Sequence, residues 1–150
     1  QGSMIRSPIP LALVLVLLLS ACGPGGGAGM PGDSSEVQPF SGISGDETLY
    51  FSGTEPFWGG QASGDILTYT TPENPDGEQI VVKQFGGRGG MGLSGVREGE
   101  AFDMTITPGV CSDGMSDREY PFSVTLKLAD EVRLGCAWSD AEPVSEEAVP

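Results

Sequence analysis

The stretch "YPFSVTLKLADEVRLGCAW", residues 120–138, decides the fold because its apolar residues recur at every second position. The first half carries apolar side chains at positions 120, 122, 124, 126 and 128, and the second half at 132, 134, 136 and 138. Alternation with a period of two is typical of antiparallel strands that bury one face. The stretch therefore predicts a hairpin of two such strands.

The turn of this hairpin predicts its register. A three-residue turn at 129–131 sets apolar residues opposite one another. The pairs are Leu128 with Val132, Leu126 with Leu134, Val124 with Cys136 and Phe122 with Trp138. A two-residue turn would pair apolar with polar positions, because a slip of one residue moves every side chain to the other face. We therefore expect the three-residue turn, with Cys136 pointing into the core.

The rest of the folded region has the same character. No stretch shows a helical period, and turn signals occur at "NPDGE" (74–78), "GGRGG" (86–90) and "REGE" (97–100). The sequence predicts an all-β domain, a small antiparallel barrel or sandwich of about seven or eight strands with one disulfide. A barrel would remove the exposed strand edges. The expected strands are 48–52, 57–61, 66–71, 79–85, 91–97, 101–107, 119–128 and 132–138.

Composition divides the mature chain into three parts. Residues 22–45 are rich in Gly, Ser and Pro and predict a flexible tether. Residues 46–138 are long enough for one small core and form the predicted β domain. Residues 139–150 are acidic and low in apolar content, which predicts a disordered tail.

The N-terminal residues predict export and lipidation. Residues 1–3 have the character of a cloning remnant, and 4–21 that of a lipoprotein signal peptide. The apolar run 9–19 is shorter than the ~20 residues of a membrane-spanning helix. It ends in "LSAC", where the thiol of Cys22 would accept a diacylglyceryl group, and palmitate-type chains then anchor the protein stably. Gly23, in place of an aspartate, favours the bacterial outer membrane, with the domain facing the periplasm.

Charge and composition exclude several functions. Removal of the signal peptide removes Arg6 and no acid, so the mature chain carries 21 acids and six basic residues, a net charge of −15. Such a chain has no basic surface with which to bind nucleic acid. It attracts basic partners, and we expect a basic envelope protein as the partner. The sequence has no histidine, which excludes Ser-His and Cys-His nucleophile pairs. We expect no enzymatic activity, metal or cofactor.

Two cysteines remain after Cys22, namely Cys111 and Cys136. In an exported protein such a pair most simply forms one disulfide, and without histidine two cysteines do not make a zinc site. The bond would close a loop of about 25 residues, worth roughly 3–3.5 kcal/mol in the chain-entropy model.

The stretch "CSDGMSDREYPF", 111–122, allows two interpretations. The acids at 113, 117 and 119 could hold a hard cation such as calcium, although their spacing does not match the EF-hand pattern. Alternatively, the stretch is a structural knot in which Cys111 ties the loop to the last strand and Arg118 pairs with Asp113 or Asp117. Loop acids beside Asp-Gly are usually turn formers, which favours the knot. Asp113, Asp117 and Arg118 then remain as a secondary binding surface.

A second distinctive stretch is "GTEPFWGG", 53–60. Glu55 precedes Pro56 and is therefore biased toward an extended conformation. Phe57 and Trp58 offer one ring to each face of a strand, so one ring should enter the core and the other lie at the rim. The alternatives are a stacking site at Trp58 and a buried acid at Glu55, and both residues are candidates for a binding surface.

Together, "GTEPFW" (53–58), "CSDGMSDREYPF" (111–122) and "GCAW" (135–138) resemble the motifs of an uncharacterised family of small bacterial exported lipoproteins. Its members open on a GxEPFW-type motif and close on CSDGMSDxxYP…GCA. The family is similar in setting to META-domain and MliC-type lipoproteins, and MliC-type domains inhibit c-type lysozyme. That inhibitor's motif is absent here, so none of its active residues can be carried over. The resemblance implies an exported lipoprotein with a β domain.

We therefore expect a non-enzymatic outer-membrane lipoprotein that acts as an envelope binding or maintenance module. One alternative is an inhibitor of a basic enzyme that attacks the envelope, such as c-type lysozyme. Another is a carrier of a small apolar ligand inside the barrel.

Overall fold

The computed structural model describes Gly2 and residues 39–146, and in this part of the chain every regular element is a strand. The predicted signal peptide, the predicted lipidation site Cys22 and most of the predicted tether lie outside the described residues. The strands are β1 (Leu49–Thr54), β2 (Phe57–Ser63), β3 (Ile66–Thr71), β4 (Asn74–Gly86), β5 (Met91–Arg97), β6 (Glu100–Ser112), β7 (Arg118–Leu128), β8 (Glu131–Ser139) and β9 (Ser145–Glu146).

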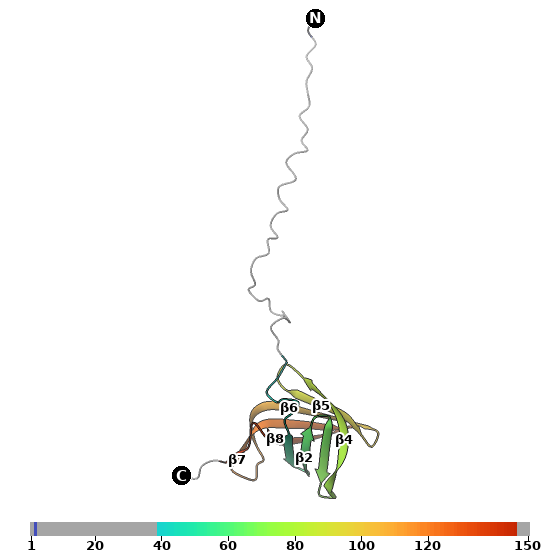
Figure 1. Cartoon of the computed structure of the whole chain (residues 1–150), viewed down its shortest axis with the longest axis vertical. Coiled ribbons are helices and arrows are strands. Elements are labelled where there is room, and N and C mark those ends of the chain that lie inside the picture. The colour runs from blue at the N-terminus through green and yellow to red at the C-terminus, as the bar shows by residue number, and fades with distance from the viewer. Residues whose placement is uncertain (1, 3–38, 147–150) are drawn as a thin grey trace. The chain divides into compact units, whose positions relative to one another are not determined.

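The strands β1 to β8 form a closed up-and-down barrel (Figure 1). Each strand pairs antiparallel with the next, and β8 returns to pair with β1. The predicted all-β fold is confirmed, in its barrel form. Because the strands alternate in direction, their connections alternate between two ends. The β1–β2, β3–β4, β5–β6 and β7–β8 turns lie at one end, called here the turn end, and the β6–β7 loop lies at the opposite loop end.

The inward side chains of all eight strands fill the barrel. The largest fully buried ones include Tyr69, Phe51, Phe102 and Phe122. An eight-stranded barrel is just wide enough for its own side chains, so a core of this size leaves a packed interior. The remaining core positions include Leu49, Leu67, Ile80, Val82, Leu93, Met104, Ile106, Val124 and Leu126.

The domain starts earlier than composition predicts. Ile43 is 7% exposed and belongs to the core, and Phe40 packs against the core. The backbone N–H of Phe40 also donates to the carbonyl of Gly87 at 2.8 Å. Residues 39–45 are thus part of the barrel, and the predicted boundary of the tether at 45 is wrong because two apolar side chains within a polar stretch suffice to dock it.

The "NPDGE" turn signal is also misplaced. Thr71 pairs with Asn74, so the β3–β4 turn lies at 72–73 and residues 74–78 belong to β4. The register shifts between the Tyr69–Glu78 and Thr71–Asn74 pairs, and Gly77 has a φ of 80°. The turn-forming residues therefore make a bulge in β4. A glycine adopts a positive φ as readily in a bulge as in a turn.

The register of the β7–β8 hairpin differs from the prediction by one residue. Leu126 pairs with Arg133, and Thr125 pairs with Leu134, around a two-residue turn at 129–130. Leu134 is consequently 67% exposed and Val132 59% exposed. The apolar set of β8 lies on the outer wall of the barrel, and the predicted three-residue turn is wrong.

The inward set of β8 explains this register. Arg133 points inward, and its Nη1 donates to the hydroxyl of Tyr69 at 2.7 Å. At Gly135 a Cβ atom would collide with the Ser52 carbonyl and contact the ring of Trp58, so only glycine lets β8 cross β1 this closely. Outside the barrel, Trp138 stacks on Tyr50 with ring centroids 5.6 Å apart.

The C-terminal segment is ordered further than predicted. Ser139 is buried, its hydroxyl hydrogen-bonds the carboxylate of Glu47, and the backbone N–H of Glu142 donates to Ser139 Oγ at 3.0 Å. The short strand β9 pairs with the start of β7. The predicted disordered tail is therefore wrong for 139–146, because backbone and hydroxyl bonds dock a segment that has few apolar residues. Residues 147–150 lie outside the described part.

A pair of leucine substitutions tests the hairpin register. Leu126→Ala removes a fully buried side chain and should lower the free energy of unfolding by about 2–5 kcal/mol. Leu134→Ala removes an exposed side chain and should change it by less than about 0.5 kcal/mol. Urea unfolding followed by tryptophan fluorescence measures both. Equal losses would instead support the register in which the two leucines face each other in the core.

Candidate functional site

The β6–β7 connection is shorter than predicted. β6 extends to Ser112 and β7 begins at Arg118, so five residues, 113–117, form the loop. The sequence suggested a loop from 108, but residues 108–112 continue β6 through an irregularity between Pro108 and Cys111. The long connection is thus mostly a bulged strand.

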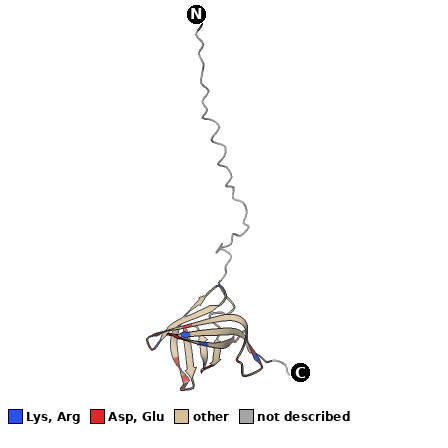
Figure 2. Ribbon diagram, turned by 180° about the vertical axis from the view of Figure 1, so that it is seen from behind, with Lys and Arg blue, Asp and Glu red and all other residues tan. Residues whose placement is uncertain are grey.

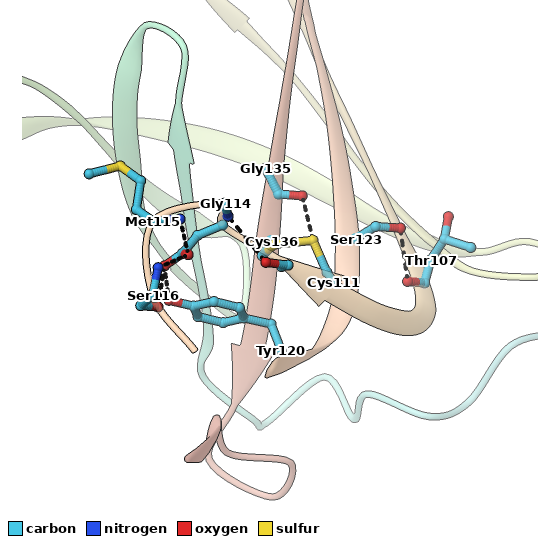
Figure 3. Close-up of a disulfide and its surroundings, with 11 residues drawn as sticks. Thr107, Cys111, Gly114, Met115, Ser116, Tyr120, Ser123, Gly135 and Cys136 are labelled. Atoms are coloured by element: carbon cyan, nitrogen blue, oxygen red, sulfur yellow. Dashed lines mark hydrogen bonds between the residues drawn. A yellow bond between two sulfur atoms is a disulfide. The ribbon is translucent and has the colours of Figure 1, made fainter. Parts of the chain in front are cut away.

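Asp113 organises this loop, and Figure 3 labels its partners Met115, Ser116 and Tyr120. Its Oδ1 accepts the backbone N–H groups of Met115 at 2.9 Å and Ser116 at 2.8 Å. Its Oδ2 accepts the hydroxyls of Ser116 at 2.8 Å and Tyr120 at 3.1 Å. The two backbone bonds, followed by the Ser116 hydroxyl, lower the pKa of Asp113 to about 2. The carboxylate therefore accepts its hydrogen bonds from residues of the loop and from Tyr120 in β7.

The predicted disulfide joins Cys111 to Cys136, with Cα atoms 5.6 Å apart, and ties β6 to β8 across β7. Cys136 pairs with the outward residue Ser123 and is not part of the core cluster, although it is only 1% exposed. The prediction that Cys136 points into the core is wrong, because the one-residue shift of register turns it to the outer wall. The sulfur of Cys111 lies 3.5 Å from the carbonyl oxygen of Gly135.

These contacts support the knot interpretation of the loop. Within residues 39–146, no three Cys, Asp or Glu side chains are grouped closely enough to hold a metal ion. Gly114, at a φ of 71°, donates its N–H to Ser112 Oγ at 3.2 Å and completes the turn. These bonds of the loop thus stay within it or reach the adjoining ends of β6 and β7.

The five predicted surface residues do not form one surface. Asp113, Asp117 and Arg118 lie at the loop end, whereas Glu55 and Trp58 belong to the β1–β2 hairpin at the turn end. Sequence spacing could not show this, because the end at which a turn lies depends on the strand order.

Trp58 is a core residue and not a surface residue. It is 4% exposed and contacts the rings of Phe51 and Tyr69 at 5.8 and 6.2 Å, while the neighbouring Phe57 is 54% exposed. The prediction of one core ring and one rim ring is confirmed. Glu55 is exposed, which contradicts the alternative of a buried acid.

The turn end carries a charged cluster around Tyr69 that the sequence did not reveal. The guanidinium of Arg97 lies 5.4 Å from the centroid of the Tyr69 ring and bonds Glu78. Arg133 donates to the Tyr69 hydroxyl and bonds Glu131 at 2.8 Å. Burial raises the pKa of Tyr69, and the two guanidinium groups oppose that rise. The charge of each arginine is thus balanced by a glutamate at the turn end of the barrel.

An acidic rim surrounds this cluster, and acidic segments mark the tips of hairpins in Figure 2. The rim consists of exposed carboxylates in or beside all four turns of the turn end. A pocket of about 220 Å³ between the β5–β6 and β7–β8 hairpins is lined by Arg97, Arg133 and three of these acids. The acidic rim comprises Glu55, Glu73, Asp76, Glu98, Glu100, Asp130 and Glu131.

No family model, curated protein or solved structure matches this chain. No helix within residues 39–146 is long and apolar enough to cross a membrane. Function is therefore inferred from the residues themselves.

The disulfide should stabilise the barrel substantially. Replacing both cysteines, Cys111→Ala with Cys136→Ala, releases a 25-residue link and should lower the free energy of unfolding by about 3 kcal/mol. Chemical denaturation of the oxidised protein and of the double variant gives this value. A double variant as stable as the wild type would show that the link contributes nothing.

The Asp113 carboxylate should make stability depend on pH. Its pKa falls from 3.8 to about 2 on folding, so its contribution is complete above pH 4 and disappears as the pH falls toward 2. The stability difference between wild type and Asp113→Asn should therefore shrink between about pH 4 and pH 2. Asp117→Asn, a loop substitution outside this bonding pattern, is the control and should show no such change. A difference independent of pH would contradict the assignment.

Proposed function

We propose that this chain is a non-enzymatic, lipid-anchored binding module of the bacterial envelope that engages a basic partner protein through the acidic rim. The observation that carries this proposal is the charge at the turn end. Seven exposed carboxylates lie in or beside the four turns, whereas Arg97 and Arg133 are half-buried and bonded to glutamates. Exposed charge of one sign steers a partner of opposite charge and speeds association.

The scaffold makes the rim a suitable binding surface. Its turns are short, with two-residue connections at 55–56 and 98–99, and they join strands of a closed barrel. The backbone of such a turn loses little freedom when the rim binds a partner, which reduces the entropic cost of association.

The proposed location rests on the sequence. The apolar run 9–19 followed by "LSAC" supports lipidation of Cys22, and Gly23 supports the outer membrane, with the barrel in the periplasm. The absence of histidine excludes the common nucleophile–histidine pairs and supports a binding role.

A second candidate is inhibition of a basic enzyme that attacks the envelope, such as c-type lysozyme. The acidic rim and the resemblance to lipoproteins found in the setting of MliC-type inhibitors favour it. A ligand carrier is less favoured, because the aromatic side chains of Tyr69, Phe51, Phe102 and Phe122 fill the barrel.

Two variants of equal charge test the proposal. The rim variant carries Glu55→Gln, Glu73→Gln, Glu100→Gln and Asp130→Asn, four exposed acids outside the arginine cluster. The control variant carries Asp46→Asn, Asp65→Asn, Asp117→Asn and Glu119→Gln, four exposed acids away from the turn end. In pull-downs from envelope extract, wild type and control should retain the same basic proteins, and the rim variant should lose them. Equal losses by both variants would show that net charge, and not the rim, governs binding.

Purified c-type lysozyme distinguishes the second candidate. Its activity is measured with each of the three proteins at micromolar concentration. Inhibition by wild type and control, weakened about tenfold in the rim variant, would support an inhibitor that uses the rim. Unchanged lysozyme activity would remove this candidate and leave the pull-down as the test of the binding module.

A further inference from the structure

The outer wall of the barrel carries a fixed aromatic ring away from the acidic rim. Phe85, on β4, is 58% exposed and pairs with Gly92 on β5. The end of its ring lies directly over Gly92, where a Cβ atom would overlap it. The far end of the ring therefore covers the Gly92 backbone, while much of the side chain remains open to solvent. An exposed aromatic held in this way is a ready stacking surface.

An anchored turn places a cation beside this ring. Gly87 donates its N–H to the carbonyl of Gly90 at 2.8 Å, and the N–H of Phe40 fixes Gly87 from the other side. Arg88, at the tip of this turn, is exposed and has no ion-pair partner within residues 39–146. In a chain of net charge −14, a free guanidinium beside an aromatic ring is a distinctive feature.

A row of hydroxyls leads away from the ring across the wall. A pocket of about 250 Å³ is lined by Phe85, Arg88, the glycines of the turn, Thr105 and Thr107. On the next strand, Thr125 pairs with Thr105 and Ser123 pairs with Thr107. Figure 3 shows Ser123 and Thr107 side by side next to the disulfide. These four exposed residues, Thr105, Thr107, Ser123 and Thr125, are called here the hydroxyl belt.

The hydroxyl belt connects two pockets. Ser123 and Thr125 also line a pocket of about 410 Å³, together with Ser52, Thr54 and Leu134. From β5 to β8 the wall spans three strand spacings, about 14 Å. That length suits a short oligomer and exceeds a single small ring.

We propose that this wall binds a glycan strand that carries widely spaced carboxylates. One sugar ring stacks its C–H face on Phe85, and its carboxylate bonds Arg88. The following sugars lie along the hydroxyl belt, where serine and threonine exchange hydrogen bonds with sugar hydroxyls. An apolar platform with a few convergent polar groups is the usual chemistry of a small-ligand site.

A glycan fits this wall better than other polymers. β5, β6 and β7 are paired on both sides, so an extended peptide finds no free strand edge on which to add. The net charge of the chain repels a densely charged polyanion, while the single Arg88 suits an isolated carboxylate. This site lies on a different face from the acidic rim and does not depend on the proposed function.

Two soluble oligosaccharides test the site by titration calorimetry with the purified chain. One is an N-acetylglucosamine tetramer, and the other contains alternating N-acetylmuramic acid, which supplies the carboxylates. Wild type should bind the muramic-acid oligomer more tightly. Phe85→Ala and Thr105→Val should each weaken both oligomers, the first by about tenfold. Arg88→Ala should abolish the preference for the carboxylated oligomer.

Val81→Ala is the matched control, because Val81 is also an exposed apolar residue of β4 but lies outside the pocket. It should bind both oligomers like wild type, as should the rim variant. Backbone amide shifts on titration should centre on residues 86–92 and on the hydroxyl belt. No binding by wild type at millimolar concentration would overturn the proposal. Equal affinity of Phe85→Ala, Thr105→Val and Val81→Ala would overturn it too, as would shifts confined to the turn end.

Discussion

The rest of the structure depends on the pairing of the first barrel strand, β1, with the last barrel strand, β8. Four residue pairs, from Leu49–Ser139 to Ser52–Cys136, join β1 to β8 and turn an open meander into a barrel. Bringing together segments so distant in the chain is entropically costly, and without this step both strands would be exposed sheet edges. The contacts around the seam offset that cost: the Tyr50–Trp138 stack, the Ser139 hydroxyl bond and the Cys111–Cys136 link.

Closure also determines what each face of the barrel presents. β8 crosses β1 closely at Gly135, which leaves room for Trp58 inside and directs Arg133 toward Tyr69. The same crossing places the disulfide and Leu134 on the outer wall. The alternating turns then collect carboxylates at one end, while the wall keeps its hydroxyls and Phe85. An acidic end and a wall that carries hydroxyls and an exposed ring are thus two consequences of one closure.

Periodicity predicted β6, β7 and β8, because alternation records burial directly, and less regular apolar runs between turn signals predicted the other five barrel strands, although β4 and β6 are longer than expected. It failed on the register of β8, where Arg133 and Gly135 occupy inward positions that composition assigns to solvent. An inward arginine is tolerable only because Glu131 and Tyr69 bond it, and Tyr69 lies far from Arg133 in the sequence. The acidic rim was missed for a similar reason, since its turns converge only once the strand order is known. The disulfide and the turn-forming role of Asp113 could be predicted because they follow from the cysteine pair and from local bonds, whereas the extent of the loop could not.

Backbone nuclear Overhauser effects between β1 and β8 test barrel closure most directly. In the oxidised protein in solution, the account predicts cross-strand contacts between Ser52 and Cys136 and between Tyr50 and Trp138. Contacts displaced by one residue, such as Ser52 with Ala137, would contradict the register. The absence of any contact between the two strands would contradict the closed barrel itself.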